Sequence, residues 1–138
     1  MLLQIENYDA DGQRVEKTVS GASVDYIYDL AGHQIAEVNS SGGANREEVY
    51  AGGRHLATYV NNTTYFDHAD WLGTERVRTA VNGTACESIA SLPFGDGMST
   101  SGTCGDASPM HFTGKERDGE TNLDYFGARY YSSQMVFV

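Results

Sequence analysis

The sequence YDADGQRV at residues 8–15 recurs 20 residues later as YDLAGHQI at residues 28–35. Both copies read Tyr-Asp-x-x-Gly-x-x-aliphatic. Shorter copies follow at residues 50–56, where one residue is missing before the glycine, and at residues 70–77. An aspartate at the first turn position accepts backbone hydrogen bonds, and a glycine at the fourth takes the positive φ needed there. The repeat length fits two strands and two turns, so the pattern predicts one β-hairpin per repeat and a continuous twisted sheet.

Strand-like sequence continues beyond these copies. Residues 61–62 (Asn-Asn) and 82–83 (Asn-Gly) each separate two such runs, and Asn-Gly between strands is a strong hairpin signal. Residues 95–108 are rich in Gly, Ser, Thr and Asp without periodicity, which predicts a loop, and residues 112–131 return to strand-like sequence. We therefore expect an all-β fold in which consecutive antiparallel hairpins form a curved sheet.

The composition agrees with this fold class and excludes several functions. The 138 residues include 16 glycines and 9 tyrosines but 2 prolines, which is typical of short strands joined by glycine turns and not of a helical bundle. A formal net charge of −10 argues against binding to nucleic acid or to anionic lipid, because phosphate groups repel an acidic protein. No apolar run approaches the roughly 18 residues of a membrane-spanning helix. The first six residues lack the basic flank and apolar length of a signal peptide.

Three further stretches carry a family resemblance. They are YFDHADWLGTER at residues 65–76, FTGKERD at residues 112–118 and LDYFGARYY at residues 123–131. Together with the Tyr-Asp repeats, they resemble the end of a rearrangement-hotspot (RHS) protein, also called a YD-repeat protein. The last two stretches resemble the signature of the RHS-associated core domain. The resemblance extends over nearly the whole chain, from about Tyr8 to Ser133.

The resemblance implies an organisation and a role. It divides the chain into YD-repeat hairpins at residues 1–60 and an RHS-associated core region at residues 61–138, truncated after Tyr131, within one continuous sheet. In the family, the repeat sheet coils into a hollow shell, the core domain closes one end, and a variable toxin segment is often held inside. The chain is thus expected to be a non-enzymatic scaffold, a portion of an RHS-type β-shell in a secreted or cell-surface bacterial protein of the polymorphic-toxin type. Its partners would be the remainder of the shell and an enclosed C-terminal polypeptide.

The residues that the repeats and the resemblance single out are structural, and no catalytic, metal-binding or cofactor-binding residue is assigned among them. They are Tyr8, Asp9, Gly12, Tyr28, Asp29, Gly32, Gly73, Arg76, Gly114, Glu116, Arg117, Asp118, Gly127, Arg129, Tyr130 and Tyr131. Many family members cleave themselves in an aspartate-dependent reaction at an Asp-Pro-x-Gly element after the core signature. Here SSQMVFV follows instead. A self-cleaving core is therefore the alternative function, and a carbohydrate-binding module that uses exposed tyrosines is a second alternative.

The sequence offers few candidates for metal binding. Residues 7–12 resemble the first half of a calcium loop, but Thr18 stands where a bidentate glutamate is required, so an ordinary Asp–Gly turn is the better interpretation. The four histidines have no paired metal-ligand spacing with one another or with the cysteines. We therefore expect no metal site and no cofactor.

Three other groups of residues have a structural interpretation. The acids at residues 116, 118, 120 and 124 lie among basic residues, which predicts a charged strand face with cross-strand pairs rather than a catalytic pair. The aromatic residues are expected to pack between strands. Cys86 and Cys104 bracket the predicted loop; a disulfide between them would close about 18 residues and stabilise the fold by roughly 3 kcal/mol. Two free thiols remain the alternative.

Both ends of the chain resemble strands without partners. Leu2, Leu3 and Ile5 run almost directly into the first turn, and residues 135–138 (MVFV) are apolar, β-prone and uncharged. Unpaired strand edges promote association. We therefore expect self-association through strand edges, which increases as salt screens the net charge.

Overall fold

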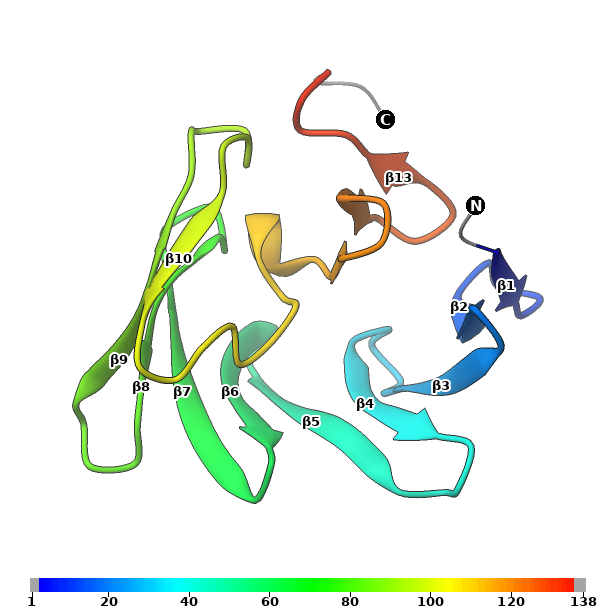
Figure 1. The fold of residues 1–138 in the computed structure, drawn as a ribbon, viewed down its shortest axis with the longest axis horizontal. Coiled ribbons are helices and arrows are strands. Elements are labelled where there is room, and N and C mark those ends of the chain that lie inside the picture. Colours follow the sequence, from blue (N-terminus) through cyan, green and yellow to red (C-terminus); the bar gives the residue numbers. More distant parts are fainter. Residues whose placement is uncertain (1–2, 136–138) are drawn as a thin grey trace.

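The computed structural model describes residues 3–135 of the chain. Within that range the protein is all-β, as expected, and no helix is long and apolar enough to cross a bilayer. Ten strands form one antiparallel sheet in which each strand pairs with the next along the chain (Figure 1). The strands are β1 (Gln4–Tyr8), β2 (Arg14–Val19), β3 (Ala22–Tyr28), β4 (Gln34–Asn39), β5 (Ala44–Ala51), β6 (Arg54–Val60), β7 (Thr63–Ala69), β8 (Glu75–Thr79), β9 (Ala85–Ala90) and β10 (Ser99–Gly102).

The Tyr-Asp motif forms the turns at one end of this sheet. The N–H of Asp9 donates to the carbonyl of Gln13 at 2.9 Å, and the N–H of Gly12 donates to the carbonyl of Asp9 at 3.1 Å. Oδ1 of Asp9 accepts a further hydrogen bond from the N–H of Gln13, and Gly12 has φ +80°. Residues 29–32 and 70–73 form the same turn. The hairpin turns predicted at the first two copies are therefore confirmed.

The turns at the opposite end join each even-numbered strand to the next odd-numbered one. Asn61 and Asn62 both have positive φ, as a two-residue hairpin turn between right-twisted strands requires. The N–H of Gly83 donates to the carbonyl of Ala80 in the turn between β8 and β9. Both Asn-containing hairpins predicted from the sequence are thus confirmed. The proposed boundary at residue 60 lies at one of these turns, inside the ten-stranded sheet. The expectation of one continuous sheet is corrected, because residues 117–131 contribute a separate three-stranded sheet.

The segment that follows β10 returns to the inner side of the sheet. In Figure 1 the ten strands follow an arc, the chain from yellow to orange lies inside it, and the red end lies at its open side. The N–H of Arg14 donates to the hydroxyl of Tyr125 at 2.7 Å, and the N–H of Thr113 donates to the hydroxyl of Thr74 at 3.1 Å. These contacts fix the segment to β2 and to the start of β8. Its elements are the 3-10 turn η1 (Phe112–Gly114) and a three-stranded sheet of β11 (Arg117–Asp118), β12 (Leu123–Tyr125) and β13 (Tyr130–Tyr131).

The structure corrects the expectation of a loop over residues 95–108. Ser99–Gly102 forms the edge strand β10, which pairs with β9 in antiparallel register. The sequence STSG has no apolar alternation, so only pairing with β9 identifies it as a strand. The strand-like residues 112–131 form strands of two or three residues after a 3-10 turn. The apolar end strand expected at residues 135–138 lies outside the described residues except for Met135, which is exposed in a turn.

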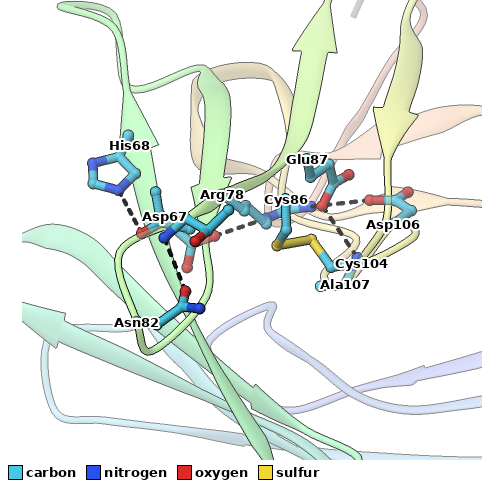
Figure 2. Close-up of a disulfide and its surroundings, with 11 residues drawn as sticks. Asp67, His68, Arg78, Asn82, Cys86, Glu87, Cys104, Asp106 and Ala107 are labelled. Atoms are coloured by element: carbon cyan, nitrogen blue, oxygen red, sulfur yellow. Dashed lines mark hydrogen bonds and ion pairs between the residues drawn. A yellow bond between two sulfur atoms is a disulfide. The ribbon is translucent and has the colours of Figure 1, made fainter.

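A disulfide closes the point at which the chain leaves the sheet. Cys86 on β9 is bonded to Cys104, with the two Cα atoms 5.3 Å apart (Figure 2). The carbonyl of Cys86 also accepts hydrogen bonds from the N–H groups of Thr103 and Cys104. Gly102 passes so close that a Cβ atom placed on it would lie 2.1 Å from the oxygen of Cys86. The chain therefore turns inward under a combined covalent, hydrogen-bonding and steric constraint.

Replacing Gly102 with alanine should be far more costly than replacing a turn glycine that has open space around it. Gly83 has φ +84° and no atom within 4 Å of an added Cβ, so Gly83→Ala should cost about 1 kcal/mol of backbone strain. Gly102 has φ +126° and would clash with β9 backbone, so Gly102→Ala should cost several times more. Urea unfolding of both variants measures the difference. Equal losses would contradict the close approach of β9 and β10.

Candidate functional site

Each of the four copies of the repeat turn places a polar side chain inside the arc. The residue two positions after the turn glycine is Arg14, Gln34, His55 or Glu75 in the four copies. We refer to this as the post-glycine position. Each of these residues stands at or next to the start of an even-numbered strand, and each side chain is buried. The repeat thus generates a row of inward-facing polar groups at one end of the sheet.

Arg14 joins the sheet to the returning segment. Its side chain is 0% exposed, and its guanidinium lies 2.7 Å from Oδ2 of Asp118 and 2.8 Å from Oε2 of Glu116. The rings of Tyr26 and Tyr125 lie on the guanidinium at 4.8 and 4.5 Å. A buried cation needs opposite charge and hydrogen bonds to offset its lost hydration. The two acids of the returning segment supply both.

Glu116 extends this contact across the first half of the sheet. Its carboxylate accepts hydrogen bonds from Gln34 Nε2 at 2.9 Å and from the hydroxyl of Tyr26 at 3.3 Å. It also lies 3.4 Å from the guanidinium of Arg46 on β5. Arg46 in turn pairs with Glu48 on its own strand at 2.7 Å. One carboxylate of the returning segment therefore contacts four side chains that come from β2, β3, β4 and β5.

Arg78 plays the corresponding part in the second half of the sheet. Figure 2 shows its guanidinium between Asp67 on β7 and Glu87 on β9, at 2.7 and 3.0 Å. Asp106, just beyond the disulfide, pairs with it at 3.0 Å, and the carbonyl of Met110 accepts a hydrogen bond from it at 2.8 Å. Arg78 is fully buried. It therefore fixes the start of the returning segment as Arg14 fixes the later part.

His55 lies among three buried carboxylates. Its Nδ1 is 2.9 Å from Oε1 of Glu75 on β8. Its Nε2 is 2.7 Å from Oε2 of Glu48 on β5 and 3.5 Å from Oδ2 of Asp67. Burial by itself lowers the pKa of a histidine, but the hydrogen-bonded Glu48 and Glu75 raise the pKa of His55 to about 10. The electronegative cluster thus holds a positive charge at His55 in this geometry.

The two glutamates of the cluster, Glu48 and Glu75, differ in their hydrogen bonds and in the direction of their pKa shifts. Burial opposes ionisation of Glu48, but its hydrogen bond to His55 and the charge of Arg46 lower its pKa. Glu75 is completely buried, and burial raises its pKa despite its contact with His55. Its Oε2 has no hydrogen-bond partner within the described residues. The cluster therefore contains a buried carboxylate oxygen that is not compensated.

A cleft of about 960 Å³ opens between this end of the sheet and the returning segment. His55, Asp67 and Glu75 line it, and Trp71, which is 92% exposed, stands at its border. The rings of His33 and Tyr50 stack in its wall with their centroids 4.5 Å apart. The cleft combines acidic and basic groups with aromatic surfaces, so it fits a polar ligand better than an apolar one.

The structure brings several residues of the two sequence motifs into one network. The hydroxyl groups of Tyr8 and Tyr130 lie 2.6 Å apart, and both hydrogen-bond to Glu6. The hydroxyl of Tyr28 donates to the carbonyl of Arg14. Tyr131 donates to the carbonyl of Phe94. Tyrosines from the first repeat and from the end of the chain therefore meet at β1 and β2.

Other motif residues act separately. Arg76 pairs with Asp70 in its own turn. Gly73 packs near Thr113 of η1, and Gly114 closes that 3-10 turn. Gly127 and Arg129 belong to the bend before β13. These residues shape turns and do not join the buried network.

The charged and aromatic residues singled out in the sequence differ in how closely they match expectation. The acids at residues 116, 118 and 124 are buried, and each pairs with an arginine. Arg117 and Asp124 do form the expected kind of cross-strand pair. The turn that resembled a calcium loop uses Asp9 to cap its own backbone. Trp71 does not pack between strands but is exposed.

The residues at the centre of the network were missed in the sequence. Arg46, Arg78 and Glu48 have no distinguishing motif, since strands of this sheet carry charges on both faces. The post-glycine residues could have been found, because a polar side chain occupies that position in all four copies. In the sequence motif Tyr-Asp-x-x-Gly-x-x-aliphatic, the post-glycine position is an unspecified residue. Because its residue type differs in each copy, the sequence does not indicate that all four side chains point inward.

The fold is similar to that of solved Tc toxin structures. The Tc holotoxin pore of Photorhabdus luminescens, with a point mutation in TccC3, matches with a TM-score of 0.69 and 20% identity. TcdB2-TccC3-TEV matches with a TM-score of 0.67 and 22% identity, and TcdB2-TccC3 without its hypervariable C-terminal region with 0.63 and 18%. Each match covers 94% of this chain and 7% of the other chain. No family model and no curated protein sequence matches the chain.

Replacing Arg14 with leucine should destabilise the fold strongly, because Asp118 and Glu116 would stay buried without their main cation. We expect a loss of about 3–5 kcal/mol in the free energy of unfolding. Arg76→Leu is the matched control: Arg76 is partly exposed and pairs with Asp70, so its loss should be about 0–1 kcal/mol. Urea unfolding measures both. Similar losses for the two arginines would contradict the role of burial in this network.

Proposed function

We propose that the chain is a wall segment of a larger β-shell of the RHS type, and that it encloses or displays another polypeptide without catalysing a reaction. The observation that carries this proposal is the ten-stranded curved sheet whose end strands, β1 and β10, pair on one side only within the described residues. A curved meander extends at either edge simply by pairing with another strand. The similarity of the fold to a Tc toxin structure, with a TM-score of 0.69, supports the same proposal.

The returning segment supports an enclosing role. It occupies the inner side of the arc and is bound there by ion pairs to the buried Arg14, Arg46 and Arg78. The inner surface is therefore polar and held in a fixed conformation. Such a surface suits a shell wall that must not aggregate with an unfolded or partly folded polypeptide inside it. We infer that the partners are further shell strands and an enclosed polypeptide. One of the similar structures is described as lacking a hypervariable C-terminal region, which is consistent with such a content.

We also propose that the protein is exported. The disulfide between Cys86 and Cys104 is typical of proteins that fold in an oxidising compartment. The resemblance to secreted bacterial toxin proteins points in the same direction.

Self-cleavage is less compatible with the arrangement of the buried aspartates. Asp118 and Asp124 lie on neighbouring strands, and both are completely buried. Arg117 is opposite Asp124 in the register, and Leu123 is opposite Asp118. Because successive side chains alternate between faces, the two carboxylates point to opposite faces and do not share a proton. We expect an unchanged intact mass after prolonged incubation, and a truncated species would favour the self-cleaving core instead.

Carbohydrate binding is the second candidate, and the exposed Trp71 beside the acidic cleft favours it. Exposed aromatic rings stack on sugar faces, and carboxylates accept hydrogen bonds from sugar hydroxyl groups. A glycan array decides between the two candidates. Specific binding that Trp71→Ala abolishes would favour the carbohydrate module, and a blank array leaves the wall segment as the better account.

The shell proposal is tested on the protein that the complete reading frame encodes. Electron microscopy of that protein should show a hollow β-shell with residues 3–102 in its wall. A polypeptide inside should resist protease until the shell is opened by denaturant. A chain that forms only an isolated domain, without a shell around or beside it, would overturn the proposal.

The isolated chain should self-associate through its sheet edges. Ile5 on the edge strand β1 and Ile27 on the central strand β3 are exposed to similar extents, 50% and 47%. Ile5→Lys should lower the associated fraction, because a lysine on an edge strand disfavours pairing with another chain. Ile27→Lys should leave it unchanged, because both edges of β3 are already paired. Sedimentation velocity in buffers of increasing salt measures the fraction, and equal effects of the two variants would contradict edge pairing.

A further inference from the structure

We propose that Glu48, His55 and Asp67 form a binding site for a divalent metal ion, with zinc as the ion that fits the donor set best. The inference is independent of the shell function. It concerns the end of the sheet at which the cleft opens, and it assigns to these three residues a role that goes beyond packing.

The three side chains converge from adjacent strands. Nε2 of His55, Oε2 of Glu48 and Oδ2 of Asp67 all lie within 4.8 Å of one another. The distances from Nε2 to the two oxygens are 2.7 and 3.5 Å. Zinc binds histidine nitrogen and carboxylate oxygen at about 2.0–2.2 Å, which puts tetrahedral ligands roughly 3.3 Å apart. The observed spacing brackets this value, so small side-chain shifts suffice to accommodate the ion.

The orientation of His55 suits a metal ligand. Its Nδ1 lies 2.9 Å from Oε1 of Glu75, so Nδ1–H donates to that carboxylate. A carboxylate on the second ring nitrogen is the usual arrangement for a metal-bound histidine, because it sets the tautomer and orients the ring. The lone pair of Nε2 then faces two carboxylates. The hydroxyl of Thr58 lies 2.5 Å from Oε2 of Glu48 and 3.2 Å from Oδ2 of Asp67, and it can donate to one of them. The remaining electron-rich atoms favour a positive charge between them, either as a proton on Nε2 or as a metal ion.

The donors are positioned by neighbours that would remain in place when an ion binds. Glu48 is held by the guanidinium of Arg46 at 2.7 Å and by the hydroxyl of Ser108 at 2.9 Å. Asp67 is held by Arg78 at 2.7 Å. The Glu48 and Asp67 side chains are 0% exposed and that of His55 is 5% exposed. The donors therefore lose little conformational freedom on binding, which favours affinity.

A separate observation favours additional positive charge at the cluster. Glu75, the partner of His55, is completely buried, and its Oε2 has no hydrogen-bond partner within the described residues. A buried carboxylate oxygen without a partner costs free energy unless a nearby positive charge compensates it. An ion next to His55 would supply that charge.

The site lies in the wall of the cleft. His55, Asp67 and Glu75 all line the cleft. Three protein ligands leave the fourth tetrahedral position for water or for an anionic group that enters from the cleft. Such an ion would also connect β5, β6 and β7, and would stiffen the end of the sheet where the returning segment leaves a gap.

The test is a titration of the whole chain, with its disulfide intact, with Zn²⁺ and with Co²⁺. We expect one Zn²⁺ per chain by isothermal titration calorimetry and d–d absorption bands of a low-coordinate Co²⁺ complex. His55→Gln should remove this binding. Glu75→Gln, which keeps the size of the side chain but alters the orientation and basicity of His55, should weaken it about 10- to 100-fold. His68→Gln is the matched control, because His68 lines the same cleft but contacts Thr79 instead of the cluster.

The outcomes separate the metal site from an imidazolium that simply neutralises the carboxylates. Absence of Zn²⁺ binding at millimolar concentration near neutral pH would overturn the proposal. Binding that survives His55→Gln but is lost in His68→Gln would assign it to a surface histidine and would overturn it too. If His55→Gln does not fold, the NMR signals of the His55 ring in the wild-type chain give the answer. They should broaden before those of the other histidines when Co²⁺ is added, and the reverse order would overturn the site.

Discussion

Arg14 meets Asp118 and Glu116 at 2.7 and 2.8 Å with no exposure of its guanidinium, and the arrangement of the whole protein depends on this contact and its counterparts. Burying an arginine is costly unless opposite charges and hydrogen bonds replace the water. The sheet carries three such arginines on its inner side, at Arg14, Arg46 and Arg78. The returning segment offsets that cost by bringing acids to each of them. The charges of the sheet and of the returning segment are therefore complementary. Without the other, each would bury charged side chains that lack an ion-pair partner.

This complementarity explains why the interior has so little apolar content. The completely buried side chains are mainly charged or hydroxyl-bearing, and the buried apolar residues are few, with aromatic contacts such as Phe112 with Tyr131 beside Ile89 and Met110. Buried ion pairs add less net stability than apolar packing but are strict about geometry. A segment that enters an arc of strands must stop in one place, and the carboxylates at residues 106, 116 and 118 define that place. The disulfide at Cys104 secures the entrance to it.

The post-glycine position links the repeat to the chemistry of the site. The turn sets the direction of the side chain two residues after its glycine, and the four copies use that direction for arginine, glutamine, histidine and glutamate. In the first two copies the side chain binds Glu116, which fixes the segment. In the third and fourth copies, His55 and Glu75 bind each other and face the cleft. The same structural position thus holds the returning segment at one side of the arc and contributes to a candidate ion site at the other.

The sequence alone determined the class of the fold and the place of most turns, because these follow from local rules. An aspartate that caps its own turn and a glycine with positive φ act within five residues, so the 20-residue period was enough to predict consecutive hairpins. The inner surface was not predictable in this way. Which face of a strand a charge occupies depends on register across the sheet, and β-bulges beside the turns shift that register by one residue. The pairing of Arg14 with Asp118 joins residues 104 positions apart, and the cluster at His55 joins three strands. Only the curvature of the sheet and the return of the chain into it bring these groups together.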